Sequence, residues 1–158
     1  MKAEQIQKIL ISKGKTLVTA ESCTGGRIAA LLTSVSGSSE YFRGGVVTYQ
    51  TEIKELVLKV PSETIDTFGV VSPETAESMR VKVCQLLQAD YAISITGFAG
   101  PTGGTDVDPV GTAYVSVGSA NEGKQFRVAS NKKNRTEIQD DFAQQALDLF
   151  FNYIQSID

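Results

Sequence analysis

The chain has 158 residues, of which 41% are hydrophobic, and a formal net charge of −3, values typical of one globular domain. This mildly acidic balance argues against nonspecific nucleic-acid binding, because phosphate contacts require a basic surface. The lack of histidine excludes a Ser-His-Asp triad, a Cys-His dyad and a histidine-ligated zinc site, and two cysteines are too few for a disulfide scaffold.

The first half of the chain alternates helical and extended patterns. Apolar residues recur at helical spacing from Ala3 to Leu10, and Gly14 is placed to end that helix. The elements predicted next are a buried strand at 16–20, a helix at 28–34, a strand at 45–49 and a short helix at 51–58 that stops before Pro61. Such alternation is typical of α/β proteins.

The second half adds a helix, a strand and a hairpin. Ser72, Pro73 and Glu74 predict a helix start, because they combine a hydroxyl N-cap, a first-turn proline and an early acid. The elements predicted after it are a strand at 91–96, a hairpin from runs at 110–117 and 124–128 around Asn121–Gly123, and a last helix capped by Asn134. Together these patterns predict a single three-layer α/β/α domain over residues 1–158, with a mixed sheet.

One long irregular segment, Gly97–Pro109, directly follows the predicted strand at 91–96. Thirteen residues without a regular pattern are unusual in a compact domain, and such loops are often functional. The carboxyl end of a strand is also where α/β proteins bind ligands. Asp106 and Asp108 have no further acids clustered near them, so we expect solvated loop residues there and no metal site.

The segment Glu21–Gly26 places a hydroxyl, on Ser22, and a thiol, on Cys23, at a tight turn between a predicted strand and a predicted helix. Two glycines allow a sharp turn and a close approach to a ligand. The helix that follows directs free N–H groups into the same space. A nucleophile, an anion cradle and a plain structural turn all fit this pattern.

A serine becomes nucleophilic only with a base, and without histidine a lysine or a tyrosine must supply it. Tyr49 closes the predicted second strand, and Lys54 lies five residues later, on the first turns of the next helix. A lysine can act as the base only if its pKa falls from about 10.4 toward 7. Spacing alone leaves open the alternative that Tyr49 is a core residue and Lys54 a solvated one.

Several motifs follow one another in a fixed order along the chain. They are Ala20–Gly26, Gly45–Tyr49 with Lys54, Gly69–Ser72, Thr96–Gly104 and Pro109–Thr112. This pattern, which covers nearly the whole chain, resembles that of the CinA C-terminal domain family. Enzyme members of that family are nicotinamide-nucleotide amidases. The resemblance therefore implies hydrolysis of nicotinamide mononucleotide to nicotinic acid mononucleotide and ammonia, a step of pyridine-nucleotide recycling.

The resemblance also implies roles for single residues. Ser22 is the implied nucleophile, assisted by Tyr49 and Lys54, and no metal or organic cofactor is required. Arg135 matches an arginine that binds the substrate phosphate, although the family's usual Gly-Asp-Arg reads Lys-Asn-Arg here. Gln139 stands where a second arginine is common, so Arg135 is expected to hold the phosphate with less help.

We expect an N–H pair at the helix start near Thr24–Gly26 to stabilise the oxyanion, and the loop Gly97–Thr105 to wrap the nucleotide. The predicted substrate-binding residues are Thr24, Gly25, Gly26, Thr96, Gly97, Gly100, Gly103, Gly104 and Arg135. The expected partner is a small-molecule nucleotide, not a nucleic acid or a membrane, and we expect a homo-oligomer, dimer or higher. The polar start, Met1–Gln5, and the lack of an apolar stretch of transmembrane length favour a cytoplasmic protein.

Three alternatives remain open from the sequence. Cys23, with Glu21 and a lysine, could replace Ser22 as the nucleophile of the same class of amidase. The chain could be a non-catalytic nucleotide-binding or regulatory module linked to competence or DNA damage, as the family name suggests. It could also be an amidase that acts on another substrate.

Overall fold

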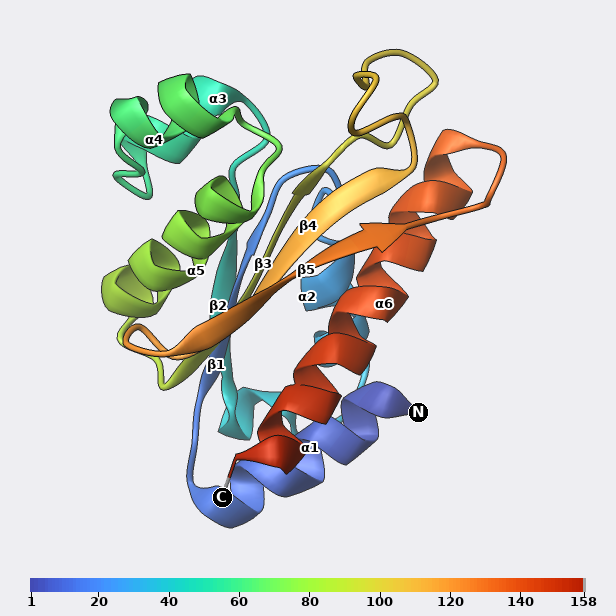
Figure 1. Cartoon of the computed structure of the whole chain (residues 1–158). Helices are drawn as coiled ribbons and strands as arrows, with labels where there is room; N and C mark the ends of the chain where they lie inside the picture. The colour runs from blue at the N-terminus through green and yellow to red at the C-terminus, as the bar shows by residue number, and fades with distance from the viewer. Residues whose placement is uncertain (158) are drawn as a thin grey trace.

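The computed structural model describes residues 1–157 and contains a five-stranded sheet with the strand order β2-β1-β3-β4-β5 (Figure 1). The strands are β1 (Leu17–Glu21), β2 (Phe42–Val47), β3 (Tyr91–Gly97), β4 (Thr112–Gly118) and β5 (Gly123–Ala129). β1 pairs in parallel with β2 and β3, whereas β4 is antiparallel to β3 and β5. The predicted mixed sheet and the predicted hairpin are both confirmed.

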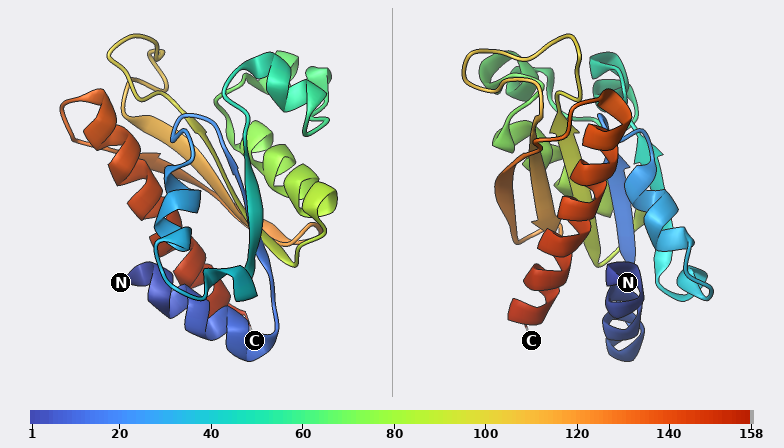
Figure 2. Two further views of the ribbon diagram at one scale, coloured as in Figure 1. Left: turned by 180° about the vertical axis from the view of Figure 1, so that it is seen from behind. Right: turned by 90° about the vertical axis from the view of Figure 1, so that its right-hand side faces the viewer.

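Helices cover both faces of the sheet, so the domain has the predicted three-layer α/β/α architecture (Figure 2). One face carries α1 (Lys2–Lys13), α2 (Arg27–Thr33) and α6 (Arg135–Ser156), and the other carries α5 (Pro73–Leu87). The shorter helices are η1 (Ser38–Glu40, a 3-10 turn), α3 (Thr51–Leu56) and α4 (Ser62–Phe68).

Each face of the sheet buries its own apolar cluster. Leu17 of β1 belongs to the cluster under α1, α2 and α6, whereas its neighbour Val18 belongs to the cluster under α5. Successive side chains of a strand point to opposite faces, and β1 is buried on both of them along its whole length. No helix among residues 1–157 combines the length and the apolar character needed to cross a bilayer.

Three predicted helix boundaries are confirmed. α1 ends at Gly14, which adopts a left-handed backbone conformation (φ 63°) that glycine tolerates without a steric cost. At the start of α5, the Ser72 hydroxyl accepts a hydrogen bond from the backbone N–H of Thr75 (3.1 Å). At the start of α6, the Asn134 side chain accepts one from the N–H of Glu137 (2.9 Å).

Two elements differ from the sequence prediction. β2 begins at Phe42 and ends at Val47, so Tyr49 lies beyond the strand and does not close it. α3 ends at Leu56, and the chain then forms α4, which the sequence pattern did not predict. α4 has one buried residue, Ile65, so it lacks the repeated apolar positions from which a helix is predicted.

The carboxyl ends of β1, β2 and β3 meet at one edge of the sheet. After β1 the chain passes to β2, and after β3 it passes to β4, so the two connections leave in opposite directions. Such a divergence opens a crevice between the strand ends, where α/β proteins bind their ligands. α3 and α4 stand on one side of this edge, and the irregular loop after β3 stands on the other (Figure 1).

Candidate active site

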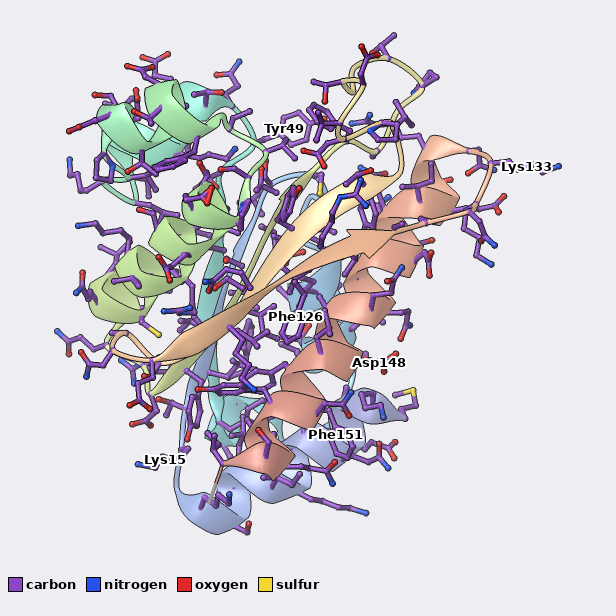
Figure 3. All side chains as sticks on the ribbon, in the orientation of Figure 1. Lys15, Tyr49, Phe126, Lys133, Asp148 and Phe151 are labelled. Atoms are coloured by element: carbon purple, nitrogen blue, oxygen red, sulfur yellow. The ribbon has the colours of Figure 1, made fainter. Side chains whose placement is uncertain are left out.

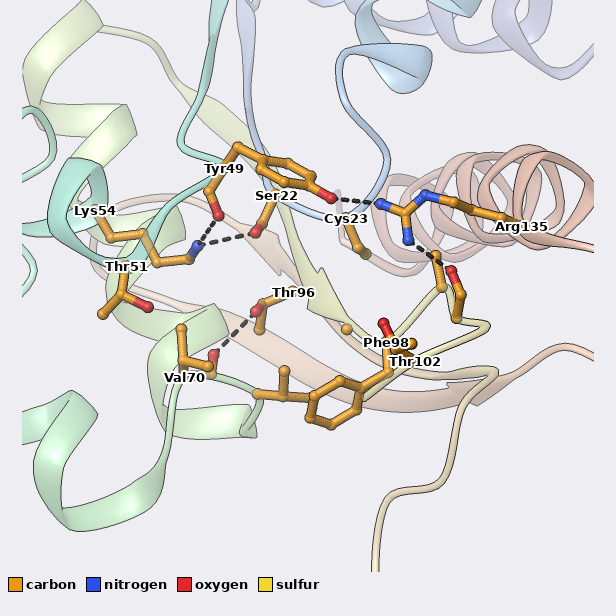
Figure 4. Close-up of a pocket in the computed structure, with 14 residues that line it drawn as sticks. Ser22, Cys23, Tyr49, Thr51, Lys54, Val70, Thr96, Phe98, Thr102 and Arg135 are labelled. Atoms are coloured by element: carbon orange, nitrogen blue, oxygen red, sulfur yellow. Dashed lines mark hydrogen bonds between the residues drawn. The ribbon is translucent and has the colours of Figure 1, made fainter. Parts of the chain in front are cut away.

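A cavity of about 280 Å³ opens at this edge of the sheet (Figure 4). Its lining residues come from five parts of the chain, which lie within 22–23, 49–54, 70–71, 96–102 and at Arg135. These parts are distant in sequence, and the crossover connections of the sheet bring them together. The cavity contains all three residues of the predicted catalytic set and Arg135.

Lys54 is the most unusual residue of the cavity, because this lysine is only 1% exposed. Its Nζ atom lies 2.8 Å from the hydroxyl oxygen of Ser22 (Figure 4). It also donates hydrogen bonds to the backbone carbonyl oxygens of Thr48 (2.7 Å) and Tyr49 (3.4 Å). Among residues 1–157 no carboxylate forms an ion pair with this amine. The amine is therefore held by neutral groups alone.

Burial lowers the pKa of Lys54 to about 8, and the neighbouring Cys23 opposes this shift. A neutral amine has two hydrogens and one lone pair. The two carbonyl oxygens can only accept, so they take both hydrogens and leave the lone pair for the Ser22 hydroxyl. This arrangement suits Lys54 to act as a general base toward Ser22.

Cys23 lies next to Ser22 but differs from it in reactivity. It is 5% exposed, and burial raises the pKa of its thiol to about 12. The thiolate, and not the thiol, is the nucleophilic form of cysteine. A thiol that stays protonated near neutral pH makes Cys23 a poor alternative to Ser22.

Tyr49 contacts Lys54 through its backbone and not through its hydroxyl. The chain turns sharply after β2, so the Tyr49 carbonyl faces the amine while the ring lies at the rim of the cavity, 54% exposed. The Tyr49 hydroxyl accepts a hydrogen bond from Nη2 of Arg135, and Nη1 of Arg135 donates to the Gly100 carbonyl (2.6 Å). In this structure the phenol is part of a bridge across the cavity mouth and forms no hydrogen bond with Ser22 or Lys54 among residues 1–157 (Figure 4).

The free N–H groups at the start of α2 are bound by a side chain of the protein and are not open to a ligand. The buried Glu21 carboxylate accepts hydrogen bonds from the Thr24 hydroxyl (2.6 Å) and from the N–H groups of Ile28 (2.8 Å) and Ala29 (3.0 Å). A carboxylate is the charge that a helix N-terminus favours. Thr24, Gly25 and Gly26 are not among the residues that line the cavity, and the Thr24 hydroxyl is taken up by the Glu21 carboxylate, so that of Thr24 only the backbone N–H remains free to serve a ligand.

The loop after β3 contributes part of the predicted set. Thr96, Gly97 and Gly100 line the cavity, whereas Gly103 and Gly104 do not. Gly97 also has a packing role, because a Cβ there would lie 2.4 Å from the Cβ of Ala113. Gly104 (φ 82°) has a similar role, since its Cβ would lie 2.7 Å from the backbone nitrogen of Val110. Glycines in this loop therefore permit close packing as well as access to a ligand.

Asp108 is not the solvated loop residue that the sequence predicted. Its Oδ1 atom accepts hydrogen bonds from the Tyr114 hydroxyl (2.9 Å) and from Nε of Arg127 (3.1 Å). Asp106 is exposed, as predicted. The Asp108 carboxylate thus joins the loop to Tyr114 of β4 and Arg127 of β5 by hydrogen bonds.

Six cavity residues were not predicted as binding residues. They are Thr51, Val70, Val71, Phe98, Ala99 and Thr102. Three of them belong to the irregular loop Gly97–Pro109, whose length had already indicated a functional loop. Val70 and Val71 precede the predicted helix start at Ser72, but only the crossover to β3 brings them to the cavity. Nothing in the sequence distinguishes Thr51.

Of the three neighbouring basic residues Lys132, Lys133 and Arg135, Arg135 reaches the cavity. Lys132 and Lys133 are exposed, and the Lys133 side chain extends away from the domain (Figure 3). Gln139, one helical turn after Arg135, does not line the cavity. It is 6% exposed, and its Nε2 atom donates to the Cys23 carbonyl (2.9 Å). Gln139 therefore lies beneath the turn that carries Ser22.

Residues 1–154 match the family model described as the CinA C-terminal domain. A CinA-like protein of Prochlorococcus marinus is 45% identical over 137 residues, which are 84% of this chain and 32% of the relative. A CinA-like protein of Desulfotalea psychrophila is 42% identical over 149 residues, which are 94% of this chain and 36% of the relative. The chain spans about a third of the length of the curated relatives it matches.

Solved structures share the fold over nearly the whole chain. The competence damage-inducible protein A (ComA) of Klebsiella pneumoniae superposes with a TM-score of 0.94 at 30% identity, covering 99% of this chain and 97% of the other. The competence/damage inducible protein CihA of Agrobacterium tumefaciens gives a TM-score of 0.91 at 36% identity, covering 96% and 92%. The architecture is therefore a shared property of these proteins.

The buried amine predicts a pH-dependent difference in stability between the wild type and Lys54→Met. Above about pH 8 the folded protein releases the Lys54 proton, whereas the unfolded chain keeps it up to its ordinary pKa. Between these values the unfolded chain binds more protons, so the wild type gains up to about 1.4 kcal/mol of unfolding free energy per pH unit over the variant. Urea denaturation of both proteins from pH 7 to 10 measures this gain, and parallel pH profiles would contradict the assigned burial.

Proposed function

The chain belongs to the CinA C-terminal domain family, and on that premise we propose that it is an amidase that hydrolyses nicotinamide mononucleotide to nicotinic acid mononucleotide and ammonia. The observation that supports this proposal most strongly is the contact of Lys54 Nζ with Ser22 Oγ at 2.8 Å. A buried lysine beside a serine is a means of activating a hydroxyl in a chain without histidine.

The proposed reaction has two halves. Ser22 Oγ forms a bond to the carboxamide carbon while its proton passes to Nζ of Lys54. The Lys54 ammonium then gives a proton to the substrate nitrogen, the C–N bond breaks, and ammonia leaves an ester on Ser22. Water attacks this ester, Lys54 takes the water's proton and returns one to Ser22, and the carboxylic acid departs. Each step moves one proton through the same amine.

The two carbonyl oxygens of Thr48 and Tyr49 serve this amine in both of its states. They hold two hydrogens of the neutral base, and they stabilise the ammonium once it carries the third. Because they keep the nitrogen in place, the third hydrogen remains directed at the reacting atoms. A pKa of about 8 allows the base to accept and to return a proton near neutral pH.

Backbone N–H groups after Ser22 are the proposed oxyanion donors. The N–H of Thr24 has no hydrogen-bond acceptor among residues 1–157, and that of Cys23 has none outside its own residue. The N–H of the residue after a nucleophilic serine serves as an oxyanion donor in other hydrolases. This pair thus lies one residue earlier than the predicted Thr24–Gly26 pair, and the N–H groups of α2 that bind Glu21 are not available.

The rest of the cavity suits a planar ring with a phosphate-bearing substituent. Phe98 and Val70 offer apolar surface for the ring. Arg135 lies at the mouth, where its guanidinium can donate hydrogen bonds to a phosphate in place of the Tyr49 hydroxyl. The Tyr49 hydroxyl would then act on substrate binding through Arg135, and not on proton transfer.

The nucleophile is tested by ammonia release from nicotinamide mononucleotide. We expect Ser22→Ala to lower kcat by at least about a thousandfold, as loss of a covalent nucleophile does elsewhere. Cys23→Ala is the matched control, because it removes the neighbouring nucleophilic atom, and it should keep most of the activity. The reverse pattern would establish a thiol mechanism. Tight nucleotide binding without any ammonia release would favour a non-catalytic module.

The phosphate contact is tested by Arg135→Ala. Losing a charge-assisted contact should lower kcat/KM on nicotinamide mononucleotide by roughly 30- to 150-fold. The riboside, which lacks the phosphate, should be a poor substrate for the wild type and nearly as poor for the variant. Lys133→Ala is the control, because that side chain extends into solvent (Figure 3). A comparable loss on both substrates would show that the phosphate is held elsewhere.

A further inference from the structure

Gln139 of α6 is joined to the residue that follows Ser22. Its Nε2 atom donates to the carbonyl oxygen of Cys23 at 2.9 Å, and the residue is 6% exposed. A buried hydrogen bond of this kind is costly to lose, because an unpaired buried carbonyl forfeits its contact with water as well. The contact therefore fixes one specific peptide group of the turn.

The Ser22 and Thr24 carbonyl groups of this turn are bound locally. The Ser22 carbonyl accepts from the Gly25 N–H (3.1 Å), and the Thr24 carbonyl accepts from the N–H (3.2 Å) and Nη1 (3.0 Å) of Arg27. Within residues 1–157, Gln139 is the one side chain distant in sequence that bonds the backbone of residues 22–26. The orientation of the Cys23–Thr24 peptide thus depends on α6.

The orientation of that peptide determines where an N–H group points. A peptide group is planar and trans, so anchoring the Cys23 carbonyl also fixes the Thr24 N–H, which points to the opposite side. This Thr24 N–H has no acceptor among the described residues, and the Cys23 N–H has none outside its own residue. Donors to an oxyanion act by being fixed in advance, and a small misorientation removes much of their effect.

We propose that Gln139 is a positioning residue, whose carboxamide holds the Cys23–Thr24 peptide so that the backbone N–H groups after Ser22 stay directed at the developing oxyanion. This inference rests on the proposed role of Ser22. Gln139 touches neither the cavity nor the reacting atoms, and it acts through the peptide that it anchors. Without its donor, the turn keeps its local bonds but loses the orientation of this peptide.

The test measures the reactivity of Ser22 directly, with an alkyl fluorophosphonate as the probe. In that reaction Ser22 Oγ forms a bond to phosphorus, the P–F bond breaks with loss of fluoride, and the hydroxyl proton passes to Lys54. The phosphoryl oxygen then occupies the place of an oxyanion. Mass spectrometry gives the rate and the labelled residue, so the result does not depend on which carboxamide is the substrate.

Gln139→Met keeps the shape of the side chain and removes the donor. We expect the probe to label Ser22 of this variant about 10- to 100-fold more slowly than Ser22 of the wild type, a loss in the range of a weakened oxyanion donor. Gln145→Met is the matched control, because Gln145 lies on the same helix and donates to the Ala129 carbonyl (2.9 Å), away from the cavity. The control should label at the wild-type rate even if both variants lose similar stability.

Gln139→Glu provides a second readout and serves alone if Gln139→Met does not fold. A protonated carboxyl can donate to the Cys23 carbonyl and an ionised one cannot, so its rate relative to the wild type should rise as the pH falls. Equal labelling of wild type and Gln139→Met, or a ratio for Gln139→Glu that does not change with pH, would overturn this inference and leave the nucleophile in place. No labelling of Ser22 in the wild type would overturn the proposed nucleophile together with it.

Discussion

The burial of one amine, that of Lys54, is the constraint on which the rest of the site depends. Placing it beside Ser22 requires β1 to end next to β2 and the chain to turn at once into α3, so that two carbonyls face the nitrogen. Desolvation lowers the pKa of this amine and thereby produces a base. The same desolvation opposes folding, which is the usual conflict between stability and activity at such sites.

The structure separates two functions that a strand-to-helix turn can combine. Glu21 occupies the start of α2 and holds the turn, while Ser22, the next residue, faces the cavity. The positive end of the helix therefore stabilises the protein's own carboxylate and not a ligand. The loop after β3 and Arg135 reach the cavity from the opposite side, and the proposed function assigns substrate recognition to them.

Apolar periodicity predicted the fold class, because it is a local property of the sequence. The Ser22–Lys54 pair was implied by the resemblance to the CinA C-terminal domain family, since spacing alone left Lys54 open as a solvated residue. The part played by Tyr49 could not be predicted, since the direction of the chain after β2 decides whether a carbonyl or a phenol meets the amine. The same holds for Val70, which reaches the cavity through the crossover, whereas Phe98 lies in the loop that was expected to wrap the nucleotide. The capping of α2 by Glu21 could not be predicted either, because it depends on the position of the first turn of α2 relative to the end of β1.

The measurement that tests the central claim most directly is the titration of Lys54 in the resting protein. NMR of protein carrying ¹³C-labelled lysine, with the signal that Lys54→Met removes as its assignment, gives the pKa of this one amine. The account predicts a midpoint near 8 and the same midpoint in the acid limb of kcat/KM. A Lys54 midpoint at the ordinary lysine value of about 10.4, with activity independent of it, would contradict the account.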